Sequence, residues 1–270
     1  MAESFAAFEF AGWEQAAAKY DLTWAALTRL FITPLLQAVR AGPNVRLLDV
    51  ACGPGYVTAE ASRLGATVTG LDFSPNMVGV ARARHPTLTF QTGDAQALPF
   101  PDGSFDAVCM NFGLLHLPNP ERGLTEAARV LRRGGHYAFT VWAGPDESPA
   151  DAAIESVVER LANPDVGLPA GPPRFGFGTT AAARATLGSR GFRPETVTVQ
   201  PAHVTWRIPS TDFLFEAERD AGVRMSGLLR AQTPEVLEAI RRGLAERLEA
   251  FRTADGLALP YVAHVISATA

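Results

Sequence analysis

A largely apolar stretch that runs directly into a turn with two glycines most limits how this chain can fold. Residues 45–51 are typical of a parallel strand covered on both faces, and a turn that ends at Gly55 follows at once. Residues 56–64 can form a helix. Such a strand, turn and helix leave free backbone N–H groups at the helix N-terminus, where the negatively charged end of a ligand binds well.

The ligand need not be a dinucleotide. The fingerprint for a bound pyrophosphate needs a small residue three positions after the second glycine, and Thr58 stands there. This disfavours NAD and FAD as ligands. A nicotinamide-dependent oxidoreductase nevertheless stays open as one alternative function.

Strand and helix patterns then alternate along the chain. Ser74-Pro75 and Asn119-Pro120 predict helix starts, since a capping side chain is followed by proline at the first helical position. The further strands are expected at 67–72, 88–92, 105–111, 136–142, 196–200 and 261–268. The predicted fold class is α/β: a Rossmann-like, doubly wound, mostly parallel seven-stranded sheet with helices on both faces and helical lid insertions.

We expect a single domain over 1–270. Its core would comprise about 41–145, 180–207 and 256–270, with a helical lid at 1–40. Proline and glycine crowd the region after Trp142, which suggests a functional loop. The insertions 146–178 and 208–255 are expected to form the acceptor pocket.

The strand and glycine turn resemble motif I of class I S-adenosylmethionine methyltransferases, through Asp49, Gly53 and Gly55. An Ala-x-x-Tyr-Asp element at Tyr20 is similar to that of the ubiquinone/menaquinone-biosynthesis type, methyltransferase domain type 11. The resemblance implies S-adenosylmethionine as cofactor and S-adenosylhomocysteine as product. The residues expected to bind the cofactor are Tyr20, Asp49, Ala51, Gly53, Gly55, Asp72, Phe73, Met77, Asp94, Ala95, Asn111 and Phe112.

Two acids carry most of this expectation. Asp72 ends the second strand, 17 positions after Gly55, where a carboxylate can accept hydrogen bonds from both ribose hydroxyls. Asp94 matches the family element that accepts from the adenine amino group. The alternatives are that Asp72 merely ends a strand, that Asp94 is a plain turn residue, and that Tyr20 is a core aromatic.

Asp49 poses a problem of sign, because its charge would repel the cofactor's carboxylate and attract its ammonium and sulfonium groups. We expect it to orient the amides of the glycine turn or to hold the amino group. The tract that begins at Asn111 departs from the Asn/Asp-Pro-Pro-Tyr signature of nucleic-acid amino methyltransferases. Methylation of nucleic-acid bases is therefore not expected.

Catalysis need not depend on any particular side chain, since alignment of the nucleophile and exclusion of water can suffice. For an acceptor that must lose a proton, His116 is the best candidate for a general base, and the alternative is that it caps or packs the next helix. Metal-ligand spacing is missing from the sequence, so no metal is expected.

The predicted function is methyl transfer to a small, largely apolar or aromatic metabolite, on oxygen, nitrogen or carbon. The alternative is a protein that binds the cofactor or its product without transfer, as a sensor or scaffold. The net charge of −4 without a basic run favours no nucleic acid or membrane partner, and a cytoplasmic location is expected. The sequence leaves the oligomeric state open. The large apolar side chains expected around the acceptor are Trp13, Trp24, Phe175, Phe177, Trp206, Phe213, Phe215 and Met225, and the alternative is that the aromatics belong to the core.

Overall fold

The computed structural model describes residues 4–174, 177 and 179–270. They fold into two compact units. The first unit comprises 1–27, 143–170 and 203–262, and the second comprises 28–142, 171–202 and 263–270. The predicted single domain with a lid and insertions stays a prediction.

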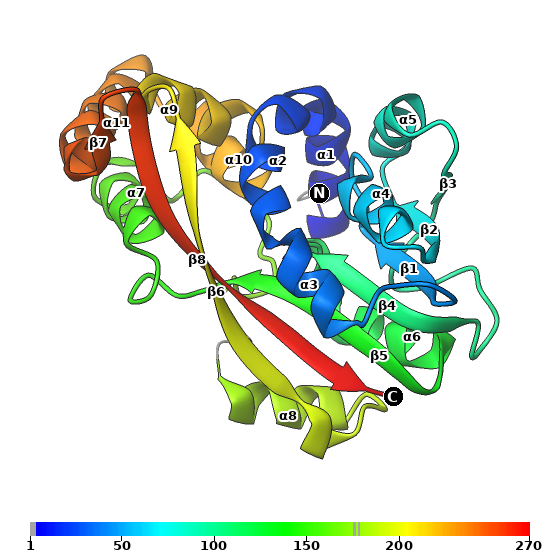
Figure 1. The fold of residues 1–270 in the computed structure, drawn as a ribbon. Helices are drawn as coiled ribbons and strands as arrows, with labels where there is room; N and C mark the ends of the chain where they lie inside the picture. The colour runs from blue at the N-terminus through cyan, green and yellow to red at the C-terminus, as the bar shows by residue number, and fades with distance from the viewer. Residues whose placement is uncertain (1–3, 175–176, 178) are drawn as a thin grey trace. The chain divides into compact units, whose positions relative to one another are not determined.

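One sheet contains all eight strands, and five of them form a parallel array in the second unit (Figure 1). The strand order is β3-β2-β1-β4-β5-β8-β6, and β7 pairs with β8 beside this path. The strands are β1 (Arg46–Val50), β2 (Thr67–Asp72), β3 (Thr89–Thr92), β4 (Phe105–Asn111), β5 (Leu131–Trp142), β6 (Thr198–Ile208), β7 (Arg252–Thr253) and β8 (Gly256–Thr269). The predicted fold class is confirmed, with β7 as a short addition to the seven strands.

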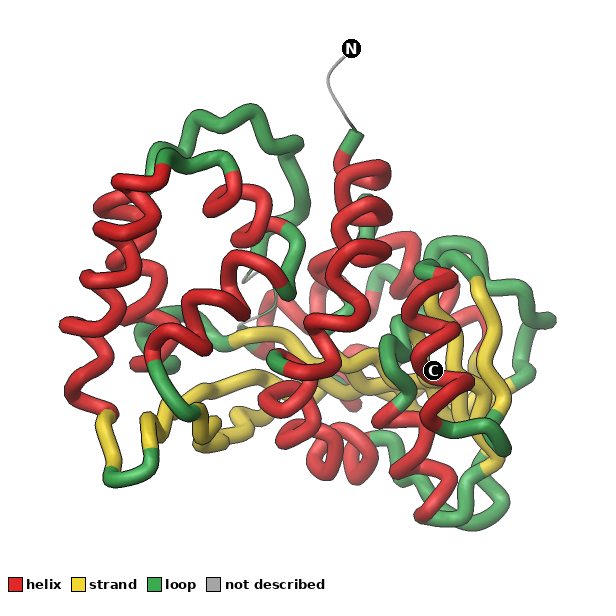
Figure 2. Tube along the Cα trace, turned by 90° about the horizontal axis from the view of Figure 1, so that it is seen from above, coloured by secondary structure: helices red, strands yellow, loops and turns green. Residues whose placement is uncertain are grey.

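Helices cover both faces of the parallel strands because each strand buries successive residues on opposite sides. Leu47 packs toward α3 (Ile32–Ala38) and α4 (Tyr56–Arg63), whereas Leu48 packs toward α6 (Pro120–Val130). Figure 1 shows α3 and α6 on either side of β4 and β5, and Figure 2 shows the yellow strands between red helices. The other helices of this unit are α5 (Pro75–Arg84), α8 (Thr180–Gly188), η1 (Arg29–Phe31), η2 (Leu114–His116) and η3 (Pro194–Thr196).

The predicted helix starts are confirmed at atomic detail. The Ser74 hydroxyl accepts from the backbone N–H of Met77, and the Asn119 side chain accepts from that of Arg122. In both helices proline occupies the first turn, where its missing N–H costs no hydrogen bond.

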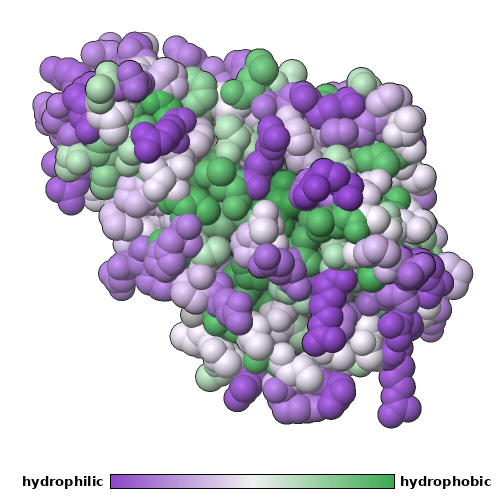
Figure 3. Space-filling view, in the orientation of Figure 1, coloured by the Kyte–Doolittle hydropathy of each residue, from purple (hydrophilic) through white to green (hydrophobic). Residues whose placement is uncertain are grey.

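Helices dominate the first unit. Thr233 caps α11 (Pro234–Arg247), whose Ile240 and Leu244 are buried, and α11 packs against α7 (Pro149–Leu161). The outer face of α11 is exposed, and the space-filling view shows mostly hydrophilic residues there (Figure 3, upper left). The unit also contains α1 (Phe5–Leu22), most of α2 (Trp24–Thr28), α9 (Thr211–Asp220), α10 (Arg224–Arg230) and η4 (Leu248–Phe251).

Two strand boundaries differ from the sequence-based expectation. β5 begins at Leu131 and not at His136, because Leu131 pairs with Phe105 before a register shift. β8 begins at Gly256 and not at Tyr261, because Gly256 pairs with Thr253 in a hairpin. The Asp255-Gly256 pair is a hairpin signal that could have predicted this turn. Among the described residues, no helix has the length and apolar character needed to cross a membrane.

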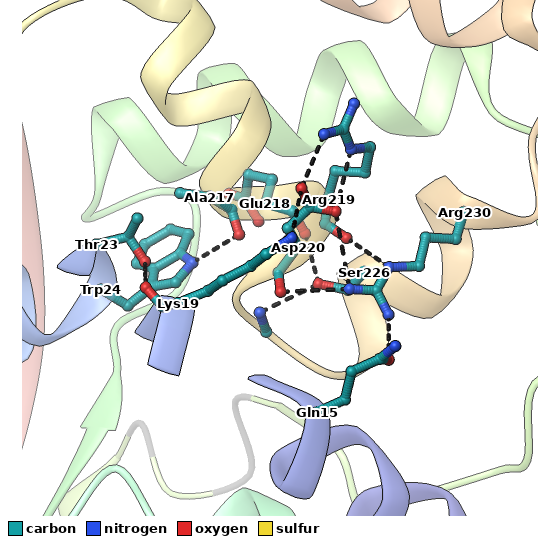
Figure 4. A network of polar contacts seen from close by, with 11 residues as sticks. Gln15, Lys19, Thr23, Trp24, Ala217, Glu218, Arg219, Asp220, Ser226 and Arg230 are labelled. Carbon is teal, nitrogen blue, oxygen red and sulfur yellow. Dashed lines mark hydrogen bonds and ion pairs between the residues drawn. The ribbon is translucent and has the colours of Figure 1, made fainter. Parts of the chain in front are cut away.

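A polar network joins three helices of the first unit around one carboxylate (Figure 4). Asp220, at the end of α9, pairs with Lys19 of α1 at 3.1 Å and with Arg219 at 2.8 Å. Arg230 of α10 donates to Gln15 of α1 at 2.6 Å and to the Asp220 carbonyl oxygen at 3.3 Å. The hydrogen bond from Arg219 is the main cause that lowers the pKa of Asp220 to about 2.

We expect Asp220→Asn to destabilise the protein by roughly 1–2 kcal/mol at pH 7, because its partners lose a shared counter-charge. The folded-state pKa lies below the unfolded value, so this contribution is present above pH 4 and is lost as the pH falls toward 2. Urea unfolding at pH 7 and pH 3 measures it. Asp212→Asn on the same helix is the control, because Asp212 is 55% exposed and should matter little. Equal effects of the two substitutions would contradict the assignment.

Candidate functional site

Unusual backbone marks the carboxyl ends of two neighbouring strands. Ala51 follows β1 with φ 55°, and Phe112 follows β4 with φ 59°, a region that residues other than glycine rarely adopt. A Cβ on Gly113 would lie 2.6 Å from the Cβ of Ala51, so the two chain turns lie very close together. The strand order reverses direction between β1 and β4, which is where open α/β sheets bind ligands.

The glycine turn after β1 needs its glycines for two different reasons. Gly55 has φ 83°, and a Cβ there would lie 2.7 Å from the ring of Phe90. Gly53 has φ 50°, but a Cβ there would meet no atom within 4 Å. The turn is therefore packed from behind at Gly55 and leaves open space at Gly53 that a ligand can fill.

Asp72 is fixed by that turn. Its carboxylate accepts from the backbone N–H of Gly53 at 2.8 Å and from that of Ser74 at 3.0 Å. The residue is only 5% exposed, with Phe73 half-buried beside it and Met77 buried in α5. Two backbone donors thus hold the carboxylate in one orientation before any ligand binds.

Asp49 is completely buried in the same region. One carboxylate oxygen accepts from the Thr58 hydroxyl at 2.6 Å, and the other has no hydrogen-bond partner among the described residues. Burial raises the pKa of Asp49 to about 7, against the hydrogen bonds from Thr58 that lower it, and the charge of Asp72 raises it further. A buried acid with an unpaired oxygen is a site for a cationic or hydrogen-bond-donating group.

Thr58 is a residue whose role the sequence did not reveal. The fingerprint comparison used it only as an argument against NAD, whereas its hydroxyl contacts Asp49 from one turn into α4. The sequence did contain a signal for this contact: a residue with a hydroxyl group in the first turn of a helix, shortly after an acidic residue in a buried strand. Such a pair can face each other across a glycine turn.

Asp94 lies next to the end of β2. The backbone N–H of Gly93 donates to the Asp72 carbonyl oxygen at 2.9 Å, which ties the two predicted acids to adjacent strand ends. Asp94 itself is exposed, and its carboxylate accepts from the backbone N–H of Gln96 at 2.8 Å, while Ala95 is buried. Asp94 therefore has both the turn geometry of the plain alternative and the location that binding requires.

Asn111 and Phe112 are held by Thr140 of β5. The Thr140 hydroxyl donates to the Asn111 side-chain oxygen at 2.7 Å and accepts from the Phe112 N–H at 2.8 Å. Phe112 stacks on Trp142, with ring centroids 4.0 Å apart, and meets the ring of Phe31 edge-on at 5.3 Å. At the end of β4, hydrogen bonds from Thr140 thus fix the backbone, and an aromatic cluster lies next to them.

The two remaining predicted residues, His116 and Tyr20, belong to different units. His116 is half-buried at the end of η2, and its backbone N–H donates to the Gly113 carbonyl oxygen. Tyr20 belongs to the first unit, where its ring meets Trp13 edge-on at 5.4 Å. The roles of a general base and of a cofactor contact remain predictions.

Several aromatics sought for the acceptor pocket are packing residues. Trp206 is 2% exposed and lies 5.1 Å from Trp24 and 6.1 Å from Phe213, and Phe177 packs against Phe139. Phe175 lies outside the described residues. Apolar character alone could not separate these core side chains from lining ones.

The buried acids, the open space at Gly53 and the nearby aromatics fit S-adenosylmethionine. The Asp72 carboxylate can hold ribose hydroxyls, and the unpaired Asp49 oxygen suits a positively charged group. Cys52 and Cys109 are free and buried, and burial raises the pKa of both thiols, which leaves them unreactive. Within the described residues, no group of three or more His, Cys, Asp or Glu side chains could hold a metal.

Substitution of Gly53 by alanine tests the open space. We expect Gly53→Ala to cost about 1 kcal/mol of folding stability, because φ is positive, and to weaken S-adenosylmethionine binding at least tenfold. Calorimetric titration and thermal unfolding measure the two effects. Gly79→Ala is the matched control, because a Cβ there also meets nothing within 4 Å but lies on the exposed face of α5. Unchanged affinity in Gly53→Ala would show that the space is not used.

The sheet topology defines a Rossmann-like fold. Residues 48–139 match the family model described as a methyltransferase domain, which confirms the predicted resemblance to S-adenosylmethionine-dependent enzymes over this segment. This segment contains the glycine turn and the strand ends that carry Asp72 and Asn111.

Other known proteins are similar to this chain in sequence or in fold. A demethylmenaquinone methyltransferase of Beutenbergia cavernae is 37% identical over 155 residues, which are 56% of this chain and 65% of that protein. The crystal structure of a SAM-dependent methyltransferase from Thermotoga maritima covers 97% of this chain and 99% of its own, with TM-score 0.57 and 19% identity. That of the [4+2]-cyclase SpnF covers 99% and 97%, with TM-score 0.55 and 17% identity. The chain spans less than two thirds of the length of the curated relatives that it matches first.

Proposed function

We propose that this protein transfers the methyl group of S-adenosylmethionine to a small, largely apolar or aromatic metabolite. The observation that carries the proposal is the Asp72 carboxylate, which is fixed at the end of β2 by the N–H of Gly53. A buried acid that is oriented by a glycine turn suits the hydroxyl pair of a ribose. The match to a methyltransferase domain over the same residues supports it.

Each lining residue has a proposed task. Asp72 accepts from the ribose hydroxyls, Asp94 from the adenine amino group, and Phe73 and Met77 pack against the adenine faces. Asp49 provides a negative partner for a positively charged group, and Thr58 fixes the orientation of the Asp49 carboxylate. When bound, S-adenosylmethionine supplies a methyl group that its sulfonium has already activated, so alignment and exclusion of water are the main demands on the protein.

Aromatic side chains at the end of β4 and β5 support an aromatic or apolar acceptor. Phe112 and Trp142 form a stacked pair, Phe31 meets both edge-on, and Trp142 is partly exposed. A flat ring gains area burial and stacking energy on such a group. The name of the Beutenbergia relative makes a demethylated quinol the first acceptor to test.

Transfer of labelled methyl from S-adenosylmethionine tests the proposal. The acceptor panel contains a naphthoquinol, a simple phenol, an aromatic amine and a charged sugar. We expect product with one of the aromatic acceptors, and His116→Ala lowers the rate only if the accepting atom must lose a proton to the protein. Preference for the charged sugar would contradict the acceptor class.

A second candidate is binding of the cofactor or its product without methyl transfer. The fold is shared with a protein whose structure is described as a [4+2]-cyclase, so the fold by itself does not specify transfer. Tight binding of S-adenosylmethionine without labelled product from any acceptor would favour this candidate. The methyl-transfer proposal includes three further points. The insertions 146–178 and 208–255 form the acceptor pocket, the partner is a small molecule, and the protein is located in the cytoplasm.

A further inference from the structure

The segments that line the sheet edge carry acids and no strongly basic residue. Residues 49–56, 72–77, 93–96 and 111–116 contain Asp49, Asp72 and Asp94, with His116 as the sole basic side chain. S-adenosylmethionine has a carboxylate besides its two positive groups. A negatively charged group entering this acidic surrounding needs a compensating cation from another part of the unit.

Residues 28–31 supply a segment in the right place. The Thr28 carbonyl oxygen accepts from the Asn111 side chain at 3.1 Å, and Phe31 meets Phe112 edge-on at 5.3 Å. The guanidinium carbon of Arg29 lies 4.3 Å from the ring centroid of Tyr56. The segment therefore contacts both the end of β4 and the first residue of α4, which directly follows the glycine turn.

Arg29 is the only charged residue of this segment, and its guanidinium lies over a residue next to the glycine turn. Tyr56, over which it stacks, is the first residue of α4 and directly follows Gly55. The start of α4 also presents backbone N–H groups and the positive end of the helix dipole. A guanidinium next to these donors adds full positive charge and a planar pair of N–H groups that matches a carboxylate.

We propose that Arg29 binds the carboxylate of the methionine part of S-adenosylmethionine and so determines preference for a ligand that has one. The inference rests on the proposed function, because it names a contact to the same cofactor. Tyr56 then acts as a positioning residue, since its ring supports the guanidinium from one face. In the amino-acid part of the cofactor, Asp49 would then face a positively charged group, and Arg29 would face the carboxylate.

The test compares S-adenosylmethionine with decarboxylated S-adenosylmethionine, which keeps the sulfonium and the ammonium and lacks only the carboxylate. Calorimetric titration of the full chain should give native protein a preference of about tenfold to thirtyfold for the complete ligand. Arg29→Ala should reduce this preference to less than twofold, through loss of affinity for S-adenosylmethionine alone. Arg29→Lys should fall between the two, because it keeps the charge and loses the planar donor pair.

Arg84 provides a matched control, because its guanidinium carbon lies 5.1 Å from the same Tyr56 ring. Arg84→Ala should leave the preference intact, and thermal unfolding without ligand checks that each variant is folded. If Arg29→Ala weakens both ligands equally, or weakens neither, Arg29 only packs on Tyr56 and the inference is wrong. If native protein binds neither ligand, the proposed function itself fails.

Discussion

An Asp49→Asn variant is expected to be more stable than the native protein at pH 8, by about 4 kcal/mol, and equally stable near pH 4. In the folded chain Asp49 is fully buried, and burial raises its pKa from an ordinary value of 3.8 to about 7. The difference of about 3 between these values corresponds to about 4 kcal/mol at 1.36 kcal/mol for each pKa unit. Asparagine keeps the shape and an acceptor for Thr58 but never ionises.

The sign follows from proton binding. Between pH 4 and 7 the folded state holds a proton on Asp49 that the unfolded state has lost, so the native stability falls as the pH rises through this range. Denaturant unfolding of both proteins at several pH values gives the difference directly, and the other titrating groups cancel. Thr58→Val should raise the pKa of Asp49 further, because a hydrogen bond to the ionised form is removed. A difference between native and Asp49→Asn that stays constant with pH would contradict this account.

Asp72→Ala is expected to weaken S-adenosylmethionine binding about a hundredfold, or about 3 kcal/mol. The substitution removes the acceptor for the ribose hydroxyls and also releases the Gly53 N–H that Asp72 holds at 2.8 Å. Calorimetric titration measures the loss. Asp94→Ala should cost less, because Asp94 is exposed and water can replace part of its contact.

A ligand without ribose hydroxyls separates the two effects of Asp72→Ala. A 2′,3′-dideoxy analogue should lose much less affinity on this substitution than S-adenosylmethionine, and the difference reports the direct contact. The loss common to both ligands reports the released glycine turn. Equal losses for both ligands would mean that Asp72 acts only through the turn.

The sequence predicted the elements whose signals are local. The apolar run before Gly53, the Ser74-Pro75 and Asn119-Pro120 starts, and the placement of Asp72 at a strand end all depend on neighbouring residues. Helix caps and glycine turns are determined by a few neighbouring residues, so a single sequence is enough to predict them. The α/β fold class followed because alternating strands and helices permit few arrangements.

Contacts between distant residues could not be predicted in the same way. The stacking of Phe112 on Trp142, the hydrogen bond from Thr58 to Asp49 and the position of Arg29 over Tyr56 depend on strand register and helix rotation. The positive φ at Ala51 has no sequence signal, since alanine rarely adopts it. The early strand start at Leu131 likewise depends on pairing with the distant residue Phe105.

Calorimetric titration of the native protein with S-adenosylmethionine tests the central claim most directly. We predict saturable binding at one site per chain with a dissociation constant on the order of 1–100 µM, typical of a cofactor held by a few charged and backbone contacts. Binding should weaken at least tenfold in both Gly53→Ala and Asp72→Ala. Absence of binding by native protein that unfolds cooperatively, or equal affinity of native protein and these variants, would contradict the assignment of the site.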